Sequence, residues 1–231
     1  MNLKDGISII VTVYNKEKFI ENTLESIFSQ MNKFSQLIIV DDGSTDNSLK
    51  IVSQKIKDKR SDIKLLSQIN SGPSLAINHA LKFVKYSYIK FVDGDDVLAP
   101  DALSYMKKEM ERLDLNLLYG YWEWTSNINK FHFKNHYFAS RVLRNPIEKF
   151  LKSGWGGSSN SMIKTSSFLK VGGCDKKVFV QDYSIPIRIA GYHLKNRTNE
   201  RFLIGQSDKT ICVGPEFIEN RIMDNSGQTL Y

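Results

Sequence analysis

The chain of 231 residues has few cysteines and prolines and no long apolar run. Its two cysteines, Cys174 and Cys212, offer neither a disulfide framework nor metal-ligand spacing, which favours a reduced compartment. The longest apolar run, residues 7–13, has the length of a strand and is too short to cross a membrane. No apolar export signal follows the first six residues. We therefore expect a cytoplasmic globular protein.

Glycine-rich phosphate-binding loops are also missing. The pattern Gly-x-Gly-x-x-Gly does not follow the first apolar run, and no Walker-type Gly-Lys-Ser occurs. These absences argue against nicotinamide dinucleotide binding and against P-loop phosphate chemistry.

Positive charge is in excess, with a formal net charge of +7 and an isoelectric point of about 9.2. Part of the excess lies in a segment where basic side chains are interleaved with aromatic ones: Lys130, Phe131, Phe133, Lys134, Tyr137, Phe138, Arg141, Arg144, Lys149 and Lys152. This segment is either an ordinary solvated face or a patch that contacts a membrane or an anionic acceptor. No nucleic-acid-binding module accompanies it, so we expect no nucleic acid partner.

Apolar strands and amphipathic helices alternate four times before residue 112. The expected strands are 7–13, 36–40, 63–66 and 88–92, and the expected helices are 16–30, 46–56, 72–81 and one that begins at Pro100. Strands this short and this apolar are typical of parallel strands buried on both faces. The alternation predicts an α/β fold with a mostly parallel, doubly wound, Rossmann-like sheet flanked by helices.

The second half predicts a smaller mixed region of the same domain. We expect strands at 115–124, 158–163 and 192–195, helices at 146–151, 165–171 and 182–190, and a loop or irregular hairpin at 125–145. Pro186 should lie in the first turn of its helix, where a missing backbone N–H does no harm. Trp122 and Trp124 lie on an expected strand and should pack in the core.

Polar clusters follow three of the expected strands, at residues 12–15, 41–44 and 93–96. In doubly wound sheets, ligands bind beyond the carboxyl ends of the strands. Three carboxylates within four positions, Asp93, Asp95 and Asp96, repel one another unless a cation lies among them. Mg²⁺ or Mn²⁺ shared with a substrate phosphate would satisfy them. The alternative is a polar turn that caps the next helix.

The ordered set of motifs resembles the bacterial family 2 glycosyltransferases, which have the GT-A fold. The matching segments are 12–15 (Thr-Val-Tyr-Asn), 40–46 (Val-Asp-Asp-Gly-Ser-Thr-Asp), 70–78, 91–96 (Phe-Val-Asp-Gly-Asp-Asp) and 171–175, followed by Gln181, Asp182 and Arg188. The resemblance implies that residues 1–112 bind a nucleotide-sugar donor and that residues 113–231 form the acceptor side of the same domain.

The resemblance also implies roles for individual residues. The expected nucleotide-binding residues are Thr12, Tyr14, Asn15, Asp41, Asp42, Asn78 and Asp93. A carboxylate at Asp42 can accept from the uracil imide N–H, which favours a UDP-linked donor. Asp95, with Asp93, is the expected ligand of Mn²⁺ or Mg²⁺. Asp182 is the expected general base, with an ordinary helix N-cap as the alternative. The acceptor or sugar side would include Trp155, Asp96, Gln181 and Arg188.

The implied function is metal-dependent, inverting transfer of a sugar to a glycan or lipid-linked acceptor in the synthesis of a bacterial surface polysaccharide such as capsule, lipopolysaccharide or O-antigen. The enzyme would be cytoplasmic or peripheral on the inner face of the membrane. Gln181 replaces the family's usual Glu, and Ile77 replaces a frequent Arg whose cation Lys64, Lys82 or Lys90 could supply.

Two alternatives remain open. One is a degenerate nucleotide-sugar-binding subunit that supports a partner transferase, which the replacements at Gln181 and Ile77 favour. The other is a sugar nucleotidyltransferase, which would need a glycine-rich loop with a basic residue near the N-terminus. The segment Tyr14-Asn15-Lys16 is not such a loop.

Overall fold

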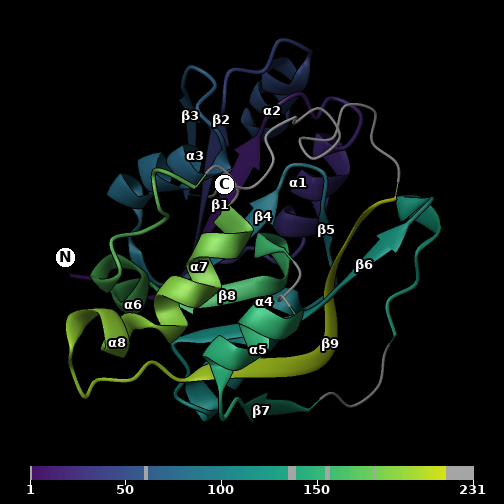
Figure 1. Cartoon of the computed structure of the whole chain (residues 1–231). Coiled ribbons are helices and arrows are strands. Elements are labelled where there is room, and N and C mark those ends of the chain that lie inside the picture. Colours follow the sequence, from purple (N-terminus) through teal and green to yellow (C-terminus); the bar gives the residue numbers. More distant parts are fainter. Residues whose placement is uncertain (1, 60–61, 135–138, 154–156, 179–180, 217–231) are drawn as a thin grey trace.

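The computed structural model describes residues 2–59, 62–134, 139–153, 157–178 and 181–216 (Figure 1). The strands are β1 Lys4–Val13, β2 Ser35–Asp41, β3 Asp62–Ser67, β4 Tyr86–Asp93, β5 Val97–Leu98, β6 Leu117–Thr125, β7 Ser140–Val142, β8 Ser161–Lys164 and β9 Ile204–Pro215. The helices are α1 Ile20–Phe28, α2 Ser48–Ile56, α3 Pro73–Ala80, α4 Ala102–Arg112, α5 Pro146–Ser153, α6 Thr165–Lys170, α7 Gln181–Ala190 and α8 Tyr192–Asn196. Short 3₁₀ turns lie at Leu81–Phe83 (η1), Ile128–Lys130 (η2) and Ser158–Asn160 (η3).

In these described residues the strands form one sheet in the order β3-β2-β1-β4-β8-β6-β9-β5, with β7 paired to β9. The first four strands are parallel, as their alternation with helices predicts. Beyond β4 the sheet is mixed, because β8 runs antiparallel to both β4 and β6. The expected parallel sheet with a smaller mixed region is therefore confirmed.

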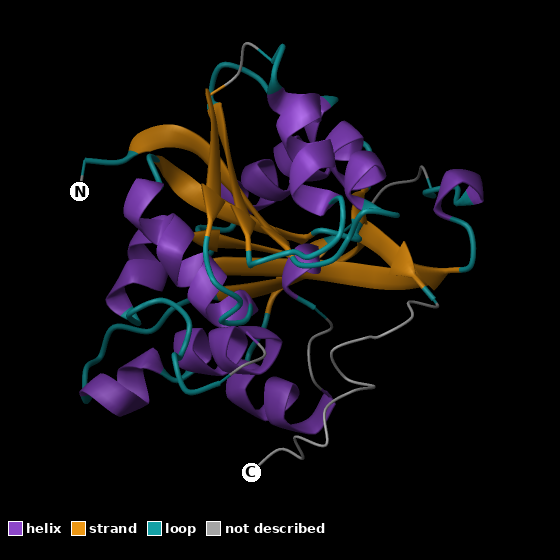
Figure 2. Ribbon diagram, turned by 90° about the horizontal axis from the view of Figure 1, so that it is seen from above, coloured by secondary structure: helices purple, strands orange, loops and turns teal. Residues whose placement is uncertain are grey.

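The two faces of the sheet bury separate apolar clusters, because neighbouring side chains of a strand point to opposite faces. On β1, Ile9 and Val11 pack with residues of α1 and α4, whereas Ile10 packs with residues of α3, α6 and α7. Figure 2 shows helices on either side of the sheet. Burial on both faces explains the apolar runs at residues 9–11 of β1 and 37–40 of β2.

β9 is the main element that the sequence did not predict. It is a strand of 12 residues that bends along the sheet (Figure 1) and pairs with β6, β5 and β7. Its centre, residues 206–209, reads Gln-Ser-Asp-Lys, and this polar run hides the strand from an apolar pattern. The two-residue β5, which pairs with it, is too short to give a pattern at all.

Three predicted details of the second half are wrong. The strand expected at 158–163 is split into η3 and β8. The strand expected at 192–195 is the helix α8, in which the Lys195 amide donates to the Gly191 carbonyl. Pro186 lies inside α7 and not in its first turn, since the helix begins at Gln181. There Pro186 removes the backbone hydrogen bond that would reach the Asp182 carbonyl.

None of the described helices is long and apolar enough to span a membrane.

Candidate functional site

The polar clusters after β1, β2 and β4 meet at one edge of the sheet. Thr12 lies opposite Val40 on β2 and opposite Asp93 on β4 in the strand register. Val13 lies opposite Asp41. The predicted coincidence of the three clusters is therefore confirmed, and it follows from parallel strands that end at the same level.

Asn15, which follows the carboxyl end of β1, holds the turn after β2. Asn15, whose φ is 51°, accepts at Oδ1 from the Thr45 amide at 2.8 Å, and its own amide donates to Ser44 Oγ at 3.1 Å. Asp41 accepts from the Ser44 amide at 3.3 Å through Oδ2. Its other oxygen, Oδ1, is buried and has no hydrogen-bond partner. An unsatisfied buried oxygen is an acceptor available to a ligand donor.

Asp42 is buried and already accepts three hydrogen bonds. Its carboxylate receives the amides of Ser71 at 2.9 Å and Gly72 at 2.8 Å and the side-chain amide of Gln68 at 2.8 Å. Asp42 thereby ties the turn after β2 to the start of α3. Tyr14, at the end of β1, is 37% exposed and can cover a ligand at this edge.

Asp93 is the centre of the acid cluster. The Thr12 hydroxyl donates to its carboxylate at 3.3 Å, and the Ser158 hydroxyl lies 3.2 Å from Oδ2. Burial, followed by the negative charge of Asp95, raises the pKa of Asp93, while Lys16 and these hydroxyls act in the opposite direction. Thr12 therefore contacts Asp93, in addition to any contact with the base of a nucleotide.

Asp95 is paired with a lysine. Lys16 Nζ lies 2.7 Å from Asp95 Oδ2, and the two side chains are 20% and 13% exposed. The pairing places one positive charge at the expected metal-ligating carboxylate.

Asp96, unlike Asp95, is buried inside the protein. Its Oδ1 accepts from Trp122 Nε1 at 3.0 Å. A Cβ at Gly214 on β9 would come within 2.4 Å of the same oxygen, so this approach requires glycine. Burial, then the charges of Asp95 and Asp93, raise the pKa of Asp96 well above its usual range. Asp96 therefore fits a supporting role better than a metal ligand.

The tryptophans of β6 differ from the expectation that both lie in the core. Trp122 is partly buried against Asp96, whereas Trp124 is 49% exposed, with the two ring centroids 3.8 Å apart. The prediction for Trp124 is wrong, because about half of this residue is exposed near the end of β6.

Lys90 lies beneath the acid cluster and is completely buried. Its ammonium donates to the carbonyls of Phe91 and Ser159. Burial lowers the pKa of Lys90 to about 8, and Asp96 and Asp93 counteract this shift.

Ser158 in η3 connects Asp93 to Asp182. Gln181 Nε2 donates to Ser158 Oγ at 3.1 Å, so the single proton of that hydroxyl is left for a carboxylate. Burial, then the negative charge of Asp93, raises the pKa of Asp182 to about 7, and the Ser158 amide and hydroxyl counteract the shift. Asp182 Oδ1 is buried without a partner. A carboxylate with a pKa near 7 and a free oxygen suits a general base.

The remaining predicted residues lie on the acceptor side or outside the described chain. The Asn78 side-chain amide donates to the Cys174 carbonyl at 3.0 Å and its oxygen accepts from the Cys174 amide at 2.9 Å, so it joins α3 to the loop before α7. Arg188 pairs with Asp175 at 3.1 Å. Trp155 lies outside the described residues. Direct ligand contacts by Asn78, Arg188 and Trp155 stay predictions.

The acids fit a divalent ion that is shared with a substrate. No group of three or more His, Cys, Asp or Glu side chains in the described part of the chain could hold a metal ion by itself. Asp95 and Asp93 nevertheless lie close together after β4, and Lys16 already places a cation there. Mg²⁺ and Mn²⁺ commonly bind through one or two carboxylates and the phosphates of the substrate. Asp95 and Asp93 are the residues that would hold the ion.

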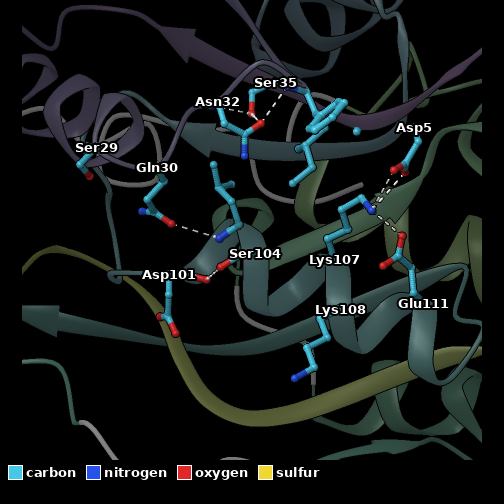
Figure 3. Close-up of a pocket in the computed structure, with 14 residues that line it drawn as sticks. Asp5, Ser29, Gln30, Asn32, Ser35, Asp101, Ser104, Lys107, Lys108 and Glu111 are labelled. Carbon is cyan, nitrogen blue, oxygen red and sulfur yellow. Dashed lines mark hydrogen bonds and ion pairs between the residues drawn. The ribbon is translucent and has the colours of Figure 1, made fainter.

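A hollow of about 510 Å³ lies elsewhere, where β1 and β2 begin (Figure 3). It is lined by Ser35, Ser104 and Lys107 among others, and Lys107 pairs there with Asp5 and Glu111. None of the polar clusters at the carboxyl ends of the strands lines it, so this hollow is separate from the candidate active site.

Comparison with known proteins agrees with this geometry. The family model described as "Glycosyl transferase family 2" matches residues 8–172. The teichoic acid poly(glycerol phosphate) polymerase of Staphylococcus epidermidis is 41% identical over 109 residues, which are 47% of this chain and 15% of the polymerase. The chain thus spans only a small part of that relative.

Two solved structures share the fold. S. aureus TarS 1–349 in complex with UDP-GlcNAc has a TM-score of 0.70 at 20% identity and covers 96% of this chain, which spans 61% of it. The mannosyltransferase PcManGT of Pyrobaculum calidifontis, in complex with GDP-Man and Mn²⁺, has a TM-score of 0.66 at 16% identity and covers 95%. With a family match over more than half of its length, the chain belongs to glycosyl transferase family 2 and has the GT-A fold.

Proposed function

We propose that this chain is the transferase domain of a metal-dependent, inverting glycosyltransferase that uses a nucleotide-sugar donor. The observation that carries the proposal is the connection of Asp93 to Asp182 through Ser158. Asp93, which we propose to lie on the donor side, and Asp182, the proposed base with a pKa near 7, both contact the Ser158 hydroxyl. Donor and acceptor would meet there.

The residues of the site suit a single displacement. Asp182 takes the proton of the acceptor hydroxyl while the oxygen of that hydroxyl forms a bond to the anomeric carbon of the donor sugar. The bond from that carbon to the diphosphate breaks on the opposite side, so the configuration inverts. One carboxylate is sufficient, since a divalent ion, when bound, neutralises the departing diphosphate as a Lewis acid.

In this proposal, the carboxyl ends of β1, β2 and β4 form the donor-binding edge. Asp42 shapes the turn that would receive the base, and the free oxygen of Asp41 is available to a ligand N–H or O–H. We favour a UDP-linked donor because a carboxylate here can accept from the uracil imide. The complex of TarS with UDP-GlcNAc supports this choice by analogy.

The acceptor we propose is a glycan or lipid-linked intermediate of a bacterial surface polysaccharide. The support is the similarity to a teichoic acid polymerase. A cytoplasmic domain that contacts the inner face of the membrane would reach such an acceptor.

A thermal-shift screen of nucleotide sugars, with and without Mn²⁺, tests the donor and the metal. We expect stabilisation by a UDP-sugar that requires Mn²⁺ and is lost in Asp95→Ala. Equal stabilisation without Mn²⁺ would contradict the metal requirement, and no stabilisation by any nucleotide sugar would contradict the donor assignment.

A catalytically degenerate binding subunit is the second candidate, because Gln181 replaces an acid. The two functions separate when the donor found in the screen is incubated with the protein and release of the nucleoside diphosphate is measured. Release that depends on Asp182 supports the enzyme, and binding without release supports the subunit.

A further inference from the structure

Lys16 occupies the expected metal position of the donor site. Its ammonium lies 2.7 Å from Asp95 Oδ2, and among the described residues no other ion pair involves Asp93, Asp95 or Asp96. An ammonium and a divalent ion that both need this carboxylate oxygen compete for it.

The backbone of Lys16 is held in place by α2 and α1. Its amide donates to Ser48 Oγ at 2.7 Å, and its carbonyl accepts from the amides of Phe19 and Ile20, each at 2.9 Å. The neighbouring Glu17 amide donates to Asp46 Oδ2 at 3.0 Å. The start of the side chain is therefore fixed, and only the flexible stem and the ammonium can move.

Gly94 provides the path for that stem. A Cβ at position 94 would lie 3.1 Å from the Thr12 carbonyl oxygen and 3.2 Å from Lys16 Cγ, both tighter than an ordinary contact, and at an ordinary 3.5 Å from Lys16 Cβ. The glycine between the acids thus lets the lysine cross the strand end and reach Asp95. The Lys16–Asp95 ion pair therefore depends on the lysine after β1 and on the glycine after β4.

The charges explain why an internal cation is useful before any ligand arrives. Asp93 lies two residues from Asp95, whose negative charge disfavours the ionised form of Asp93, and the nearby ammonium of Lys16 counteracts this. A lysine ammonium has three donors and no acceptor, so it can equally serve phosphate oxygens. When a donor brings a diphosphate and a divalent ion, both groups gain a partner if the ammonium moves from Asp95 to the diphosphate.

We propose that Lys16 is an internal counterion that holds the metal position at Asp95 and leaves it for the diphosphate, so that ion and nucleotide bind together. This inference rests on the proposed metal-dependent function. Its consequence is thermodynamic: Lys16 weakens binding of the ion alone and increases the factor by which nucleotide and ion strengthen each other. That factor must be the same whichever ligand is measured.

The test measures Mn²⁺ binding by electron paramagnetic resonance, without nucleotide and with saturating UDP, for the wild-type chain and for Lys16→Met. We expect Lys16→Met to bind Mn²⁺ about tenfold or more tightly without UDP and to show a smaller gain when UDP is added. Lys16→Gln, which keeps a polar side chain, should behave in the same way.

Lys50→Met is the matched control, because Lys50 is an exposed lysine of α2 with the same charge. It should leave both Mn²⁺ affinities unchanged. Circular dichroism melting of each variant shows that it is folded, and Mn²⁺ should raise the melting temperature of Lys16→Met more than that of the wild type.

Two results overturn the inference, and they differ in what else they affect. If the wild type binds Mn²⁺ with UDP while Lys16→Met leaves the affinity for Mn²⁺ alone unchanged, Lys16 does not compete, and the proposed function stands. If no protein binds Mn²⁺ even with UDP, the inference and the metal requirement fail together.

Discussion

The two halves of the chain handle charge differently. Residues 1–112 carry 16 basic and 15 acidic residues, whereas residues 113–231 carry 16 basic and 10 acidic ones, so their net charges are +1 and +6. In the first half the acids of the donor edge have an internal cation in Lys16. The second half has a net positive charge that its own acids do not balance. Under the proposed function, this excess would attract an anionic acceptor, whereas the near-neutral first half would select its donor through individual side chains.

The largest effect is expected when the Asp182 carboxylate is removed, because this residue of the second half lies close to the acids of the first half. Asp182→Asn should keep donor binding and lose transfer by about 10²-fold or more, since a positioned base typically contributes that much. Turnover with a saturating donor measures the loss, and calorimetry with UDP measures binding. Unchanged turnover would move the base to another residue.

The pH dependence of the wild type tests the same residue without a substitution. The pKa of Asp182 is raised to about 7 by burial and by Asp93, so the base is protonated below pH 7. We expect kcat/KM to fall about tenfold per pH unit below that value and to level above it. A profile that is flat between pH 5.5 and 8 would contradict this assignment.

The link between the halves can be weakened at Gln181, whose amide donates to Ser158. Gln181→Glu restores the usual acid of the family but removes that donor and adds a charge beside Asp93 and Asp182. We expect kcat to fall about tenfold, with a smaller change for Gln181→Met and little change in KM for the donor. A rise in kcat with Glu would show that Gln181 limits the enzyme.

The excess charge of the second half can be tested on a surface. Arg141 and Arg144 are exposed, and so are Lys50 and Lys57 in the donor half. Reversing the two arginines to Glu should reduce cosedimentation with phosphatidylglycerol vesicles about three- to tenfold at low salt, since basic residues near an anionic surface favour binding. The double variant Lys50→Glu/Lys57→Glu has the same net charge as the double arginine variant, and it should reduce cosedimentation with the vesicles less. Equal losses would indicate a non-specific charge effect.

The sequence predicts the donor half far better than the acceptor half, and the reason is physical. Strands such as β1 and β2 are buried on both faces, so their apolar runs are unmistakable, and the acids follow at the strand ends. β9 carries a polar centre in a mixed sheet and gives no such run.

The same limit applies to the residues that complete the site. Lys16 and Ser158 are distant in sequence from the acids and contact them only because the fold brings them together. Lys64, Lys82 and Lys90 were the expected sources of a cation, yet Lys90 is buried among carbonyls and Lys64 lies over the Phe83 ring. The Asn-Lys pair directly after the Thr12–Tyr14 motif was the available signal for Lys16.

The smallest expected effect concerns the stability of the fold. A carboxylate whose pKa is near 7 when folded and about 3.8 when unfolded binds its proton more tightly in the folded state. Its contribution to stability is therefore full below about pH 4 and is lost as pH rises towards and through 7.

Asp182→Asn removes that loss, so it should raise the melting temperature more at pH 8 than at pH 5. In a chain of this size about 1 kcal/mol corresponds to about 2–4 °C. Although Asp182 Oδ1 is buried, the residue as a whole is partly exposed, so we expect a difference of only a few degrees between the two pH values. The same gain at both pH values would mean that the ionised carboxylate is not destabilising in the folded protein, and the approach of Asp182 to Asp93 would then be too weak to tune a base.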